Sequence, residues 1–188
     1  MDQFVSQRKR PGIYVSFVVS FAALIGAAIV FGFAAHAANY TALSAGSVNW
    51  TATTSAGNSV IWSCTSTGAG DTCGVYPGQL ANPGGDKASV TTSGGPLTIS
   101  VNSNIPNPVT LSLNGFNGAT VQLLSGGTLN LAGTSTVSTT STANVIDLIG
   151  GTLTNTGTLN FVTTSSSGTS TLQFDGGTLS GAGVTNIG

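Results

Sequence analysis

The tetrapeptide Gly-Gly-Thr-Leu occurs three times in the carboxyl-terminal part of the chain, at residues 126–129, 150–153 and 176–179. The copies follow one another at intervals of 24 and 26 residues. Intervals of this length are typical of proteins in which one supersecondary unit is stacked repeatedly along an axis. This repeat constrains the fold more than any other feature of the chain.

Apolar and polar residues alternate in several segments of the same region, most clearly in PLTISVN and VTLSLN. A two-residue period is typical of a β-strand with one buried face. Turn-forming dipeptides such as Asn114-Gly115 and Asn117-Gly118 separate the segments, and no helical period is evident after residue 40. Disordered chains lack regularly spaced apolar residues, so we predict an all-β fold.

Apolar residues flank each glycine pair, two positions before it and two positions after it. This arrangement favours two short strands that meet at a tight bend, where glycine is most easily accommodated. The predicted corners are Gly126, Gly127, Gly150, Gly151, Gly176 and Gly177. The predicted core residues beside them are Leu124, Leu129, Leu148, Leu153, Phe174 and Leu179. A fainter copy, GGPL, occurs at residues 94–97.

Stacking these units on one another predicts a β-solenoid over residues 89–188. With a strand spacing of about 4.8 Å, about four rungs would form a rod of about 20 Å. Each repeat of such a fold contacts mainly its neighbours. The last apparent repeat is incomplete at Ile187-Gly188. We therefore expect a truncated sequence, with head-to-tail self-association through the open last rung as the alternative.

The amino-terminal segment has the layout of a secretory signal peptide. Basic residues 8–10 precede an uncharged stretch over residues 13–35, and the small-residue sequence Ala35-His36-Ala37 follows. We predict a hydrophobic signal helix within residues 1–37 that is cleaved after Ala37. The alternative is an uncleaved membrane anchor through residues 13–35, because about 20 apolar residues can span a bilayer. Both interpretations predict export.

Residues 38–188 carry very little charge. Lys87 is their sole basic side chain and Asp71, Asp86, Asp147 and Asp175 are their sole acids, which gives a formal charge of −3. Binding of nucleic acid needs clustered lysine and arginine to neutralise phosphates, so we expect no nucleic-acid partner. Serine, threonine, glycine and asparagine supply the polarity instead.

Residues 38–88 contain both tryptophans and both cysteines, and we interpret them as an amino-terminal cap. In an exported protein, Cys64 and Cys73 predict a disulfide with a loop-closure stabilisation of about 2.7 kcal/mol. Two cysteines without histidine cannot complete a zinc site, and their spacing is not that of a redox CxxC motif. Trp50 and Trp62 are expected to cover the first rung, with a sugar-stacking surface as the alternative.

The chain offers little for catalysis. Glycoside hydrolysis usually needs two facing carboxylates, and Asp147 and Asp175 precede their glycine pairs at unequal offsets of three and one residues. A serine nucleophile of a catalytic triad needs a histidine as its general base, and residues 38–188 contain no histidine. A lyase would need a basic side chain, and Lys87 is the sole candidate in residues 38–188. A calcium site would need several acids close together, and the four aspartates are scattered along the sequence. We predict no catalytic residue, no cofactor and no metal site.

The repeats GGTLNLAGTSTV, GGTLTNTGTLNF and LQFDGGTLSGAGVTNIG resemble those of bacterial extracellular β-strand-repeat proteins and of autotransporter passenger-like β-helix surface proteins. The segment VNWTATTSAGNSVIWS, followed by YPGQ and GGDKASV, resembles their amino-terminal caps. The resemblance spans residues 47–188. It implies a right-handed parallel β-helix and a role in adhesion, self-association or biofilm formation.

We therefore expect an exported cell-surface or extracellular β-solenoid with a structural or adhesive role. Rows of hydroxyl side chains such as TSTVSTTSTAN and TTSSSGTSTL suit contact with glycans, with other surface proteins or with a second solenoid. One alternative is a carbohydrate-active β-helix whose catalytic part lies beyond residue 188. The other is a membrane-anchored surface stalk.

Overall fold

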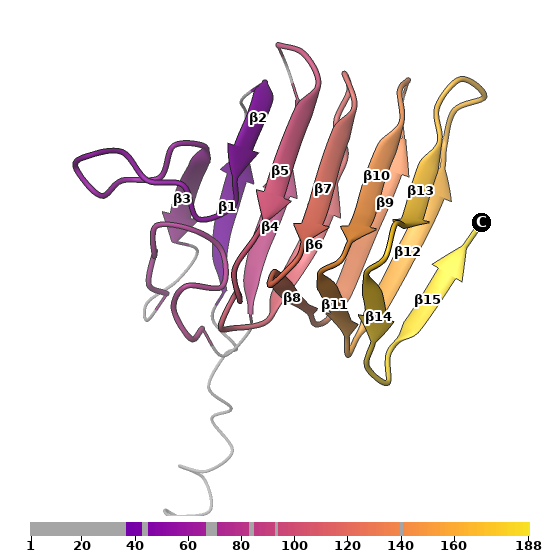
Figure 1. Cartoon of the computed structure of the whole chain (residues 1–188). Coiled ribbons are helices and arrows are strands. Elements are labelled where there is room, and N and C mark those ends of the chain that lie inside the picture. The colour runs from indigo at the N-terminus through magenta and orange to yellow at the C-terminus, as the bar shows by residue number, and fades with distance from the viewer. Residues whose placement is uncertain (1–36, 43–44, 67–70, 83–84, 93, 140) are drawn as a thin grey trace, which may run out of the picture. The chain divides into compact units, whose positions relative to one another are not determined.

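The computed structural model describes residues 37–42, 45–66, 71–82, 85–92, 94–139 and 141–188. The predicted signal peptide and its apolar stretch over residues 13–35 lie outside the described residues, Ala37 excepted. The described part forms fifteen strands in two sheets and contains no helix (Figure 1). The predicted all-β class is confirmed.

The larger sheet, sheet A, consists of β1 (Ala38–Ala42), β3 (Trp62–Ser66), β4 (Asp86–Val90), β6 (Val109–Leu113), β8 (Thr128–Leu131), β9 (Thr134–Thr139), β11 (Thr152–Asn155), β12 (Thr158–Thr163), β14 (Thr178–Ser180) and β15 (Val184–Ile187). The smaller sheet, sheet B, consists of β2 (Gly46–Asn49), β5 (Leu97–Val101), β7 (Ala119–Leu124), β10 (Asn144–Ile149) and β13 (Ser170–Phe174).

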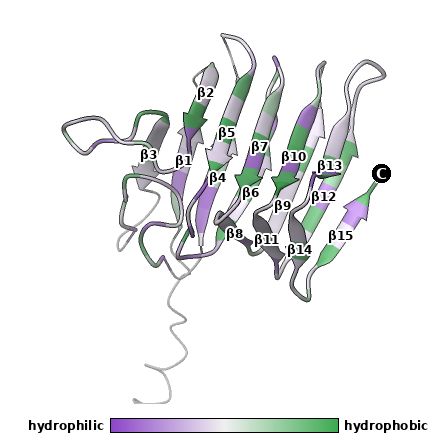
Figure 2. Ribbon diagram, viewed as in Figure 1, coloured by the Kyte–Doolittle hydropathy of each residue, from purple (hydrophilic) through white to green (hydrophobic). Residues whose placement is uncertain are grey.

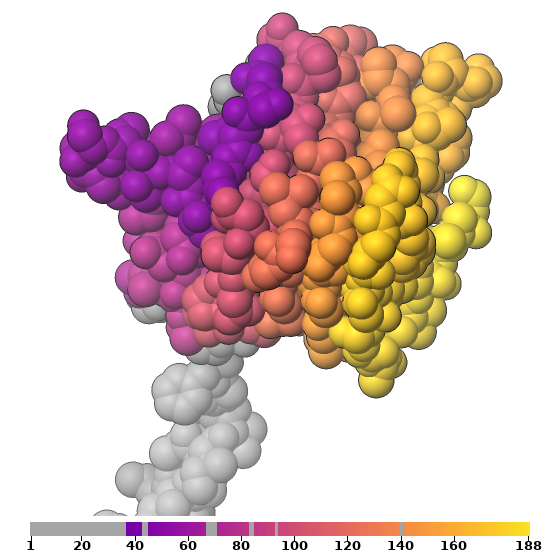
Figure 3. All heavy atoms as spheres, in the orientation of Figure 1, coloured from indigo at the N-terminus to yellow at the C-terminus, as the bar shows by residue number. Residues whose placement is uncertain are grey.

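Successive passes of the chain through each sheet pair in parallel. In sheet B the order is β2-β5-β7-β10-β13, and in sheet A the later passes contribute two short strands each, such as β8 with β9 and β11 with β12. The two sheets face each other along the stack (Figure 1), and successive rungs pack in direct contact on the visible face (Figure 3). The predicted β-solenoid is confirmed, and its right-handed sense stays a prediction.

The parallel stack begins earlier in the chain than predicted. β1 pairs in parallel with β4, and β2 pairs in parallel with β5. The first rung therefore begins at Ala38, whereas residue 89 is the predicted start and residues 38–88 the predicted cap. The repeat did not reveal this rung because the Gly-Gly-Thr-Leu signature is absent from β1 and β2. Between β2 and β4 lies a long segment that includes β3, which pairs antiparallel with β1.

The glycine pairs lie at corners between sheet B and sheet A, and the two glycines of a pair serve different purposes. Gly126 and Gly150 have φ angles of +82° and +85°, a conformation that is costly for residues with a β-carbon. A β-carbon on Gly127 would lie 2.0 Å from the carbonyl oxygen of Val101 in the preceding rung. The first glycine thus turns the chain, and the second allows two backbones to approach. Gly151, Gly176 and Gly177 repeat this arrangement in the later rungs.

We predict that Gly127→Ala lowers the free energy of unfolding by about 2 kcal/mol or more, because the new methyl group would overlap the Val101 carbonyl. The measurement is urea unfolding followed by circular dichroism. Gly94→Ala is the matched control, since a β-carbon at Gly94 meets no atom within 4 Å, and its effect should stay within about 1 kcal/mol. Equal effects of the two substitutions would contradict this account.

Alternating side chains fill the space between the sheets, as the banding of hydropathy along the strands indicates (Figure 2). Leu129 and Leu153 lie in register on neighbouring strands and are fully buried. Leu148 is also fully buried, and Leu179 is partly buried against the same core. These four leucines occupy the positions that the repeat predicts.

Two predicted core residues are placed differently. Leu148 lies in register with Leu123 rather than Leu124, because the first corner contains one residue more than the second. Leu124 therefore alternates with the buried Leu123 and faces outward. Phe174 is in register with Leu148 but is 53% exposed, since β13 is the edge strand of sheet B and no described strand covers it.

The GGPL segment is not a copy of the Gly-Gly-Thr-Leu corner. Its Leu97 begins β5 and lies in register with Ala119 in sheet B. The leucines of the three Gly-Gly-Thr-Leu copies lie in sheet A. The likeness of the two tetrapeptides is therefore local in the sequence and does not reflect equivalent places in the rung.

A buried asparagine closes the turn that leads into β7. Asn144 is fully buried at the start of β10. Its Oδ1 accepts hydrogen bonds from the backbone N–H groups of Ala119 (2.8 Å) and Gly115 (3.2 Å). Its Nδ2 donates to the carbonyl oxygens of Gly115 and Ser138. One side chain thus satisfies backbone groups that water does not reach.

Candidate functional site

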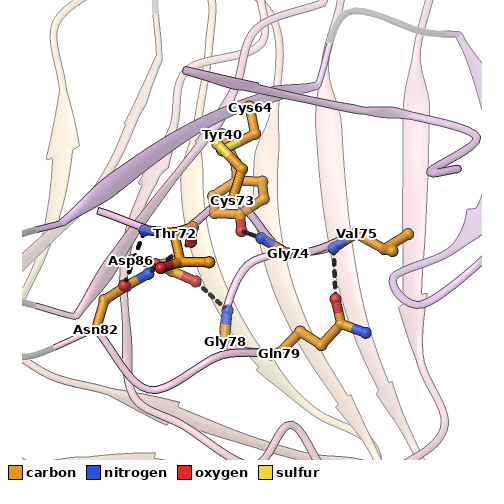
Figure 4. Close-up of a disulfide and its surroundings, with 10 residues drawn as sticks. All are labelled: Tyr40, Cys64, Thr72, Cys73, Gly74, Val75, Gly78, Gln79, Asn82 and Asp86. Carbon is orange, nitrogen blue, oxygen red and sulfur yellow. Dashed lines mark hydrogen bonds between the residues drawn. A yellow bond between two sulfur atoms is a disulfide. The ribbon is translucent and has the colours of Figure 1, made fainter. Parts of the chain in front are cut away.

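A disulfide fastens the segment between β2 and β4. Cys64 lies in β3 and Cys73 in the chain that follows, with their Cα atoms 5.9 Å apart (Figure 4). Cys64 is also in register with Tyr40 of β1. The bond is the disulfide that the sequence predicts, and it ties the non-repeating segment to the first rung of the solenoid.

Below the disulfide, two buried polar side chains hold the backbone of this segment (Figure 4). The hydroxyl oxygen of Tyr40 accepts a hydrogen bond from the N–H of Gly74 at 2.7 Å. Asp86, which is 1% exposed, accepts hydrogen bonds from the N–H of Gly78 at 2.8 Å and from Nδ2 of Asn82. Burial, reinforced by the nearby Asp86 carboxylate, raises the pKa of the Tyr40 hydroxyl. Both side chains serve the fold, and neither Asp86 oxygen is left without a partner.

Trp50 and Trp62 belong to the core, as expected from the sequence, and their burial argues against the alternative of a sugar-stacking surface. Their rings lie 4.8 Å apart between centroids, and they are 0% and 7% exposed. The indole N–H of Trp50 donates to the carbonyl oxygen of Pro77, and that of Trp62 donates to the carbonyl oxygen of Trp50. Large aromatic side chains with satisfied N–H groups are the usual anchors of a core.

A shallow hollow of about 520 Å³ lies beside the disulfide. Its polar lining comes from Asn58, Ser59 and Gln79, and Leu80 contributes an apolar edge. Gln79 already accepts a hydrogen bond from the N–H of Val75. The lining carries no charged side chain, so electrostatic attraction would not draw a charged ligand there.

The outer face of sheet B carries a second polar group, which we call the Asp147 cluster. It consists of Gln122, Asp147, Gln173 and Asp175. Gln122, Asp147 and Gln173 lie in register on β7, β10 and β13. Gln122 donates from Nε2 to Oδ2 of Asp147 at 3.4 Å, and Gln173 donates from Nε2 to Oδ2 of Asp175 at 2.6 Å.

Asp147 is held in an unusual state for a side chain on an outer face. It is 7% exposed, and its Oδ1 is buried without a hydrogen-bond partner. Burial raises the pKa of its carboxyl group; the Gln122 hydrogen bond lowers it, and the Asp175 carboxylate raises it further. The solenoid therefore keeps a poorly solvated carboxylate beside a second acid.

The tertiary structure separates the four aspartates into two kinds. Asp86 begins β4 and accepts hydrogen bonds from the segment between β2 and β4, and Asp71 lies in that segment, two residues before Cys73. Asp147 and Asp175 lie on the same outer face of sheet B, although their offsets from the glycine pairs differ, because Gln173 lies in register with Asp147 and donates to Asp175. Aligning the strands themselves, VQLL with IDLI and LQFD, would have indicated this arrangement, since Gln122, Asp147 and Gln173 then coincide.

Comparison of the chain with protein families, with curated proteins and with solved structures finds no match. In the described ranges, no three histidine, cysteine, aspartate or glutamate side chains gather where they could hold a metal ion. In the same residues no helix has the length and apolar character that crossing a membrane requires. The geometry of the described side chains is therefore the basis for any assignment of function.

We predict that the double substitution Cys64→Ser and Cys73→Ser lowers the free energy of unfolding by about 2–3 kcal/mol, because the unfolded chain regains the freedom of the closed loop. The measurement is urea unfolding of the variant and of the oxidised protein. The wild-type protein reduced with dithiothreitol is the control and should match the variant. An unchanged unfolding midpoint in both would show that the disulfide does not stabilise the fold.

We predict that Asp147→Asn stabilises the protein at neutral pH. Because the folded state raises this pKa above 3.8, the carboxyl group favours folding below pH 3.8, and that contribution is lost as pH rises through the raised value. The stability gained by the variant should therefore grow between about pH 4 and pH 7. Urea unfolding at several pH values in the presence of EDTA measures it, and parallel pH profiles for the two proteins would refute the prediction.

Proposed function

We propose that the chain is an exported structural or adhesive β-solenoid that acts at the cell surface or in the extracellular space. The observation that carries the proposal is a disulfide-fastened stack of rungs whose outer face presents continuous rows of uncharged polar side chains. The resemblance of its repeats to bacterial β-strand-repeat and autotransporter passenger-like surface proteins supports the same role.

The disulfide supports an oxidising location. Disulfides form and persist mainly in extracellular, periplasmic and comparable compartments. Cys64 and Cys73 are joined, and no free cysteine is found in the described residues. The amino-terminal segment supports export independently, because its basic start, apolar stretch and small-residue sequence have the layout of a signal peptide.

A polar row on the outer face of sheet A supports adhesion. It runs from strand to strand through residues in register, and in order these are Thr41, Ser89, Ser112, Thr136, Asn160 and Asn186. Asn186 donates a hydrogen bond from Nδ2 to Oδ1 of Asn160 at 2.8 Å. Regularly spaced hydroxyl and amide groups can hydrogen-bond to neutral sugars or to the polar surface of another solenoid.

The proposal assigns no catalytic residue to this chain. Asp86 is committed to backbone N–H and amide groups of the disulfide segment. Lys87, the sole lysine or arginine of residues 38–188, belongs to sheet A, on the opposite side of the stack from the Asp147 cluster. In the part of the chain that the structure describes, Lys87 and the Asp147 cluster are thus not placed together where a substrate could meet both.

The location is tested by recovering the protein from its native cell, separating cytosol, envelope and medium, and determining intact mass and amino-terminal sequence. We expect the protein in the envelope or medium, beginning at Ala38 and two mass units lighter than its reduced form. An amino terminus at Met1 in the membrane fraction would favour the anchored-stalk alternative. Recovery from the cytosol with reduced cysteines would overturn the proposal.

Adhesion is tested by coating beads with the purified protein and measuring their attachment to a glycan array and to one another. Replacing Ser89 and Ser112 with Ala and Thr136 with Val should reduce attachment at least about threefold, because hydrogen-bonding groups are lost while shape and charge are kept.

The matched control applies the same chemistry to the opposite sheet. Thr98, Thr120 and Thr171 lie in one outward row of sheet B, and replacing them with Val should leave attachment unchanged. Equal losses in the two triple variants would mean that the row on sheet A is not the adhesive surface. If beads coated with the wild-type protein attach neither to the glycan array nor to one another, the adhesive role is refuted and a purely structural role remains.

A further inference from the structure

The Asp147 cluster joins three successive rungs at one place on sheet B. Gln122, Asp147 and Gln173 come from β7, β10 and β13, which are neighbours in the sheet. Asp175 follows directly, and its backbone N–H donates to the carbonyl oxygen of Leu148 at 3.0 Å. This bond holds Asp175 beside the strand that carries Asp147. Parallel pairing therefore places two carboxyl groups and two side-chain amides on one outer face.

Asp147 lacks partners that a buried carboxylate ordinarily has. It is more than nine-tenths buried, its Oδ1 has no hydrogen-bond partner, and its Oδ2 has only the long bond from Gln122 at 3.4 Å. Buried carboxylates are normally paired with cations, hydrogen-bonded fully or bound to metal ions. The cluster thus has an unused oxygen in addition to its two negative charges.

Among residues 37–188, no lysine or arginine lies on the face that carries these charges. Lys87 is the sole lysine or arginine in residues 37–188, and it lies in β4 of the other sheet. Gln173 lies in register with Asp147 and donates a hydrogen bond to Asp175, so the two carboxylates lie on one outer face with a single glutamine bridging their positions. A bound cation would balance both carboxylates and relieve the poor solvation of Asp147.

The side chains of the cluster can present oxygen atoms alone to a cation if the amide groups of both glutamines rotate. Gln122 and Gln173 each carry one carbonyl oxygen, and rotating the amide exchanges that oxygen with the nitrogen. Calcium binds carboxylate and amide oxygens in a flexible geometry with several waters, whereas magnesium demands a near-ideal octahedron. Side chains from three separate rungs suit the flexible coordination of calcium better than the strict octahedral geometry of magnesium.

We propose that Asp147 and Asp175, with the amide oxygens of Gln122 and Gln173, form a calcium site that clamps three rungs of sheet B together. With two carboxylates the site would be weak, with a dissociation constant of about 0.1–1 mM, as in calcium-binding extracellular modules. Calcium would then bind the folded stack and not the unfolded chain, so it would stabilise the solenoid. This site does not depend on the proposed adhesive role.

The test uses the purified full chain, freed of metal with EDTA and then dialysed. Calcium chloride is titrated in a calorimeter, and thermal unfolding is recorded with and without 10 mM calcium. We expect saturable binding of about one ion and a rise of about 3–10 °C in the unfolding temperature. Sodium chloride at about 30 mM matches the ionic strength of 10 mM calcium chloride and controls for screening.

The variants Asp147→Asn and Asp175→Asn should each lose the calcium-dependent rise. Without calcium, Asp147→Asn is expected to be at least as stable as the wild type. Loss of its response to calcium could therefore not be attributed to a destabilised fold. Asp71→Asn removes an equal charge from the disulfide segment and should keep the full response to calcium.

Three results would overturn the site. The first is the absence of both binding heat and stabilisation up to 10 mM calcium. The second is an equal rise with the matched sodium chloride, which would mean general screening. The third is a calcium response in Asp147→Asn and Asp175→Asn that equals the wild-type response. None of these results bears on the attachment measurements, so failure of the site and failure of the adhesive role can be told apart.

Discussion

Parallel backbone pairing between rungs is the interaction on which the rest of the structure depends. It requires neighbouring passes of the chain to approach at the strand spacing of about 4.8 Å, including at the corners. The glycine pairs make this approach feasible, since a side chain on Gly127 would meet the Val101 carbonyl at 2.0 Å. Once the corners stack, Leu129, Leu153 and Leu179 follow in register, and the core forms a ladder.

The same pairing explains why the solenoid carries so little charge. A residue on one strand lies beside its counterpart on the next rung, so like charges repeated at one position would repel along the stack. Hydroxyl and amide side chains do not have this difficulty, and they can bond to one another along a row, as Asn160 and Asn186 do. Asp147 follows the same rule at its own register position, where its neighbours on the two adjoining strands are the uncharged Gln122 and Gln173.

Much of the fold could be predicted from local sequence patterns, because each strand, each corner and the disulfide loop is formed by residues that are close together in the sequence. Alternation identified the strands, the glycine pairs identified the corners, and the two cysteines identified the disulfide. The errors arose where one residue changed the register or an edge was left uncovered. The extra residue at the first corner moved Leu124 to the outside, and the edge position of β13 left Phe174 exposed. Asn144 went unnoticed because its role depends on turns some 25 residues away.

The sequence by itself determined the all-β class, the repeat length and the places where the chain must bend, since these follow from residue period and from the special backbone of glycine. Only the tertiary structure decided which rungs exist before the repeats begin, which partners the indole N–H groups of the two tryptophans bond, and that Asp147 and Asp175 lie on the same outer face. The physical reason is register: side chains far apart in the chain come together through pairing offsets of 24 to 26 residues. A difference of one residue in such an offset decides whether a side chain faces the core or the solvent.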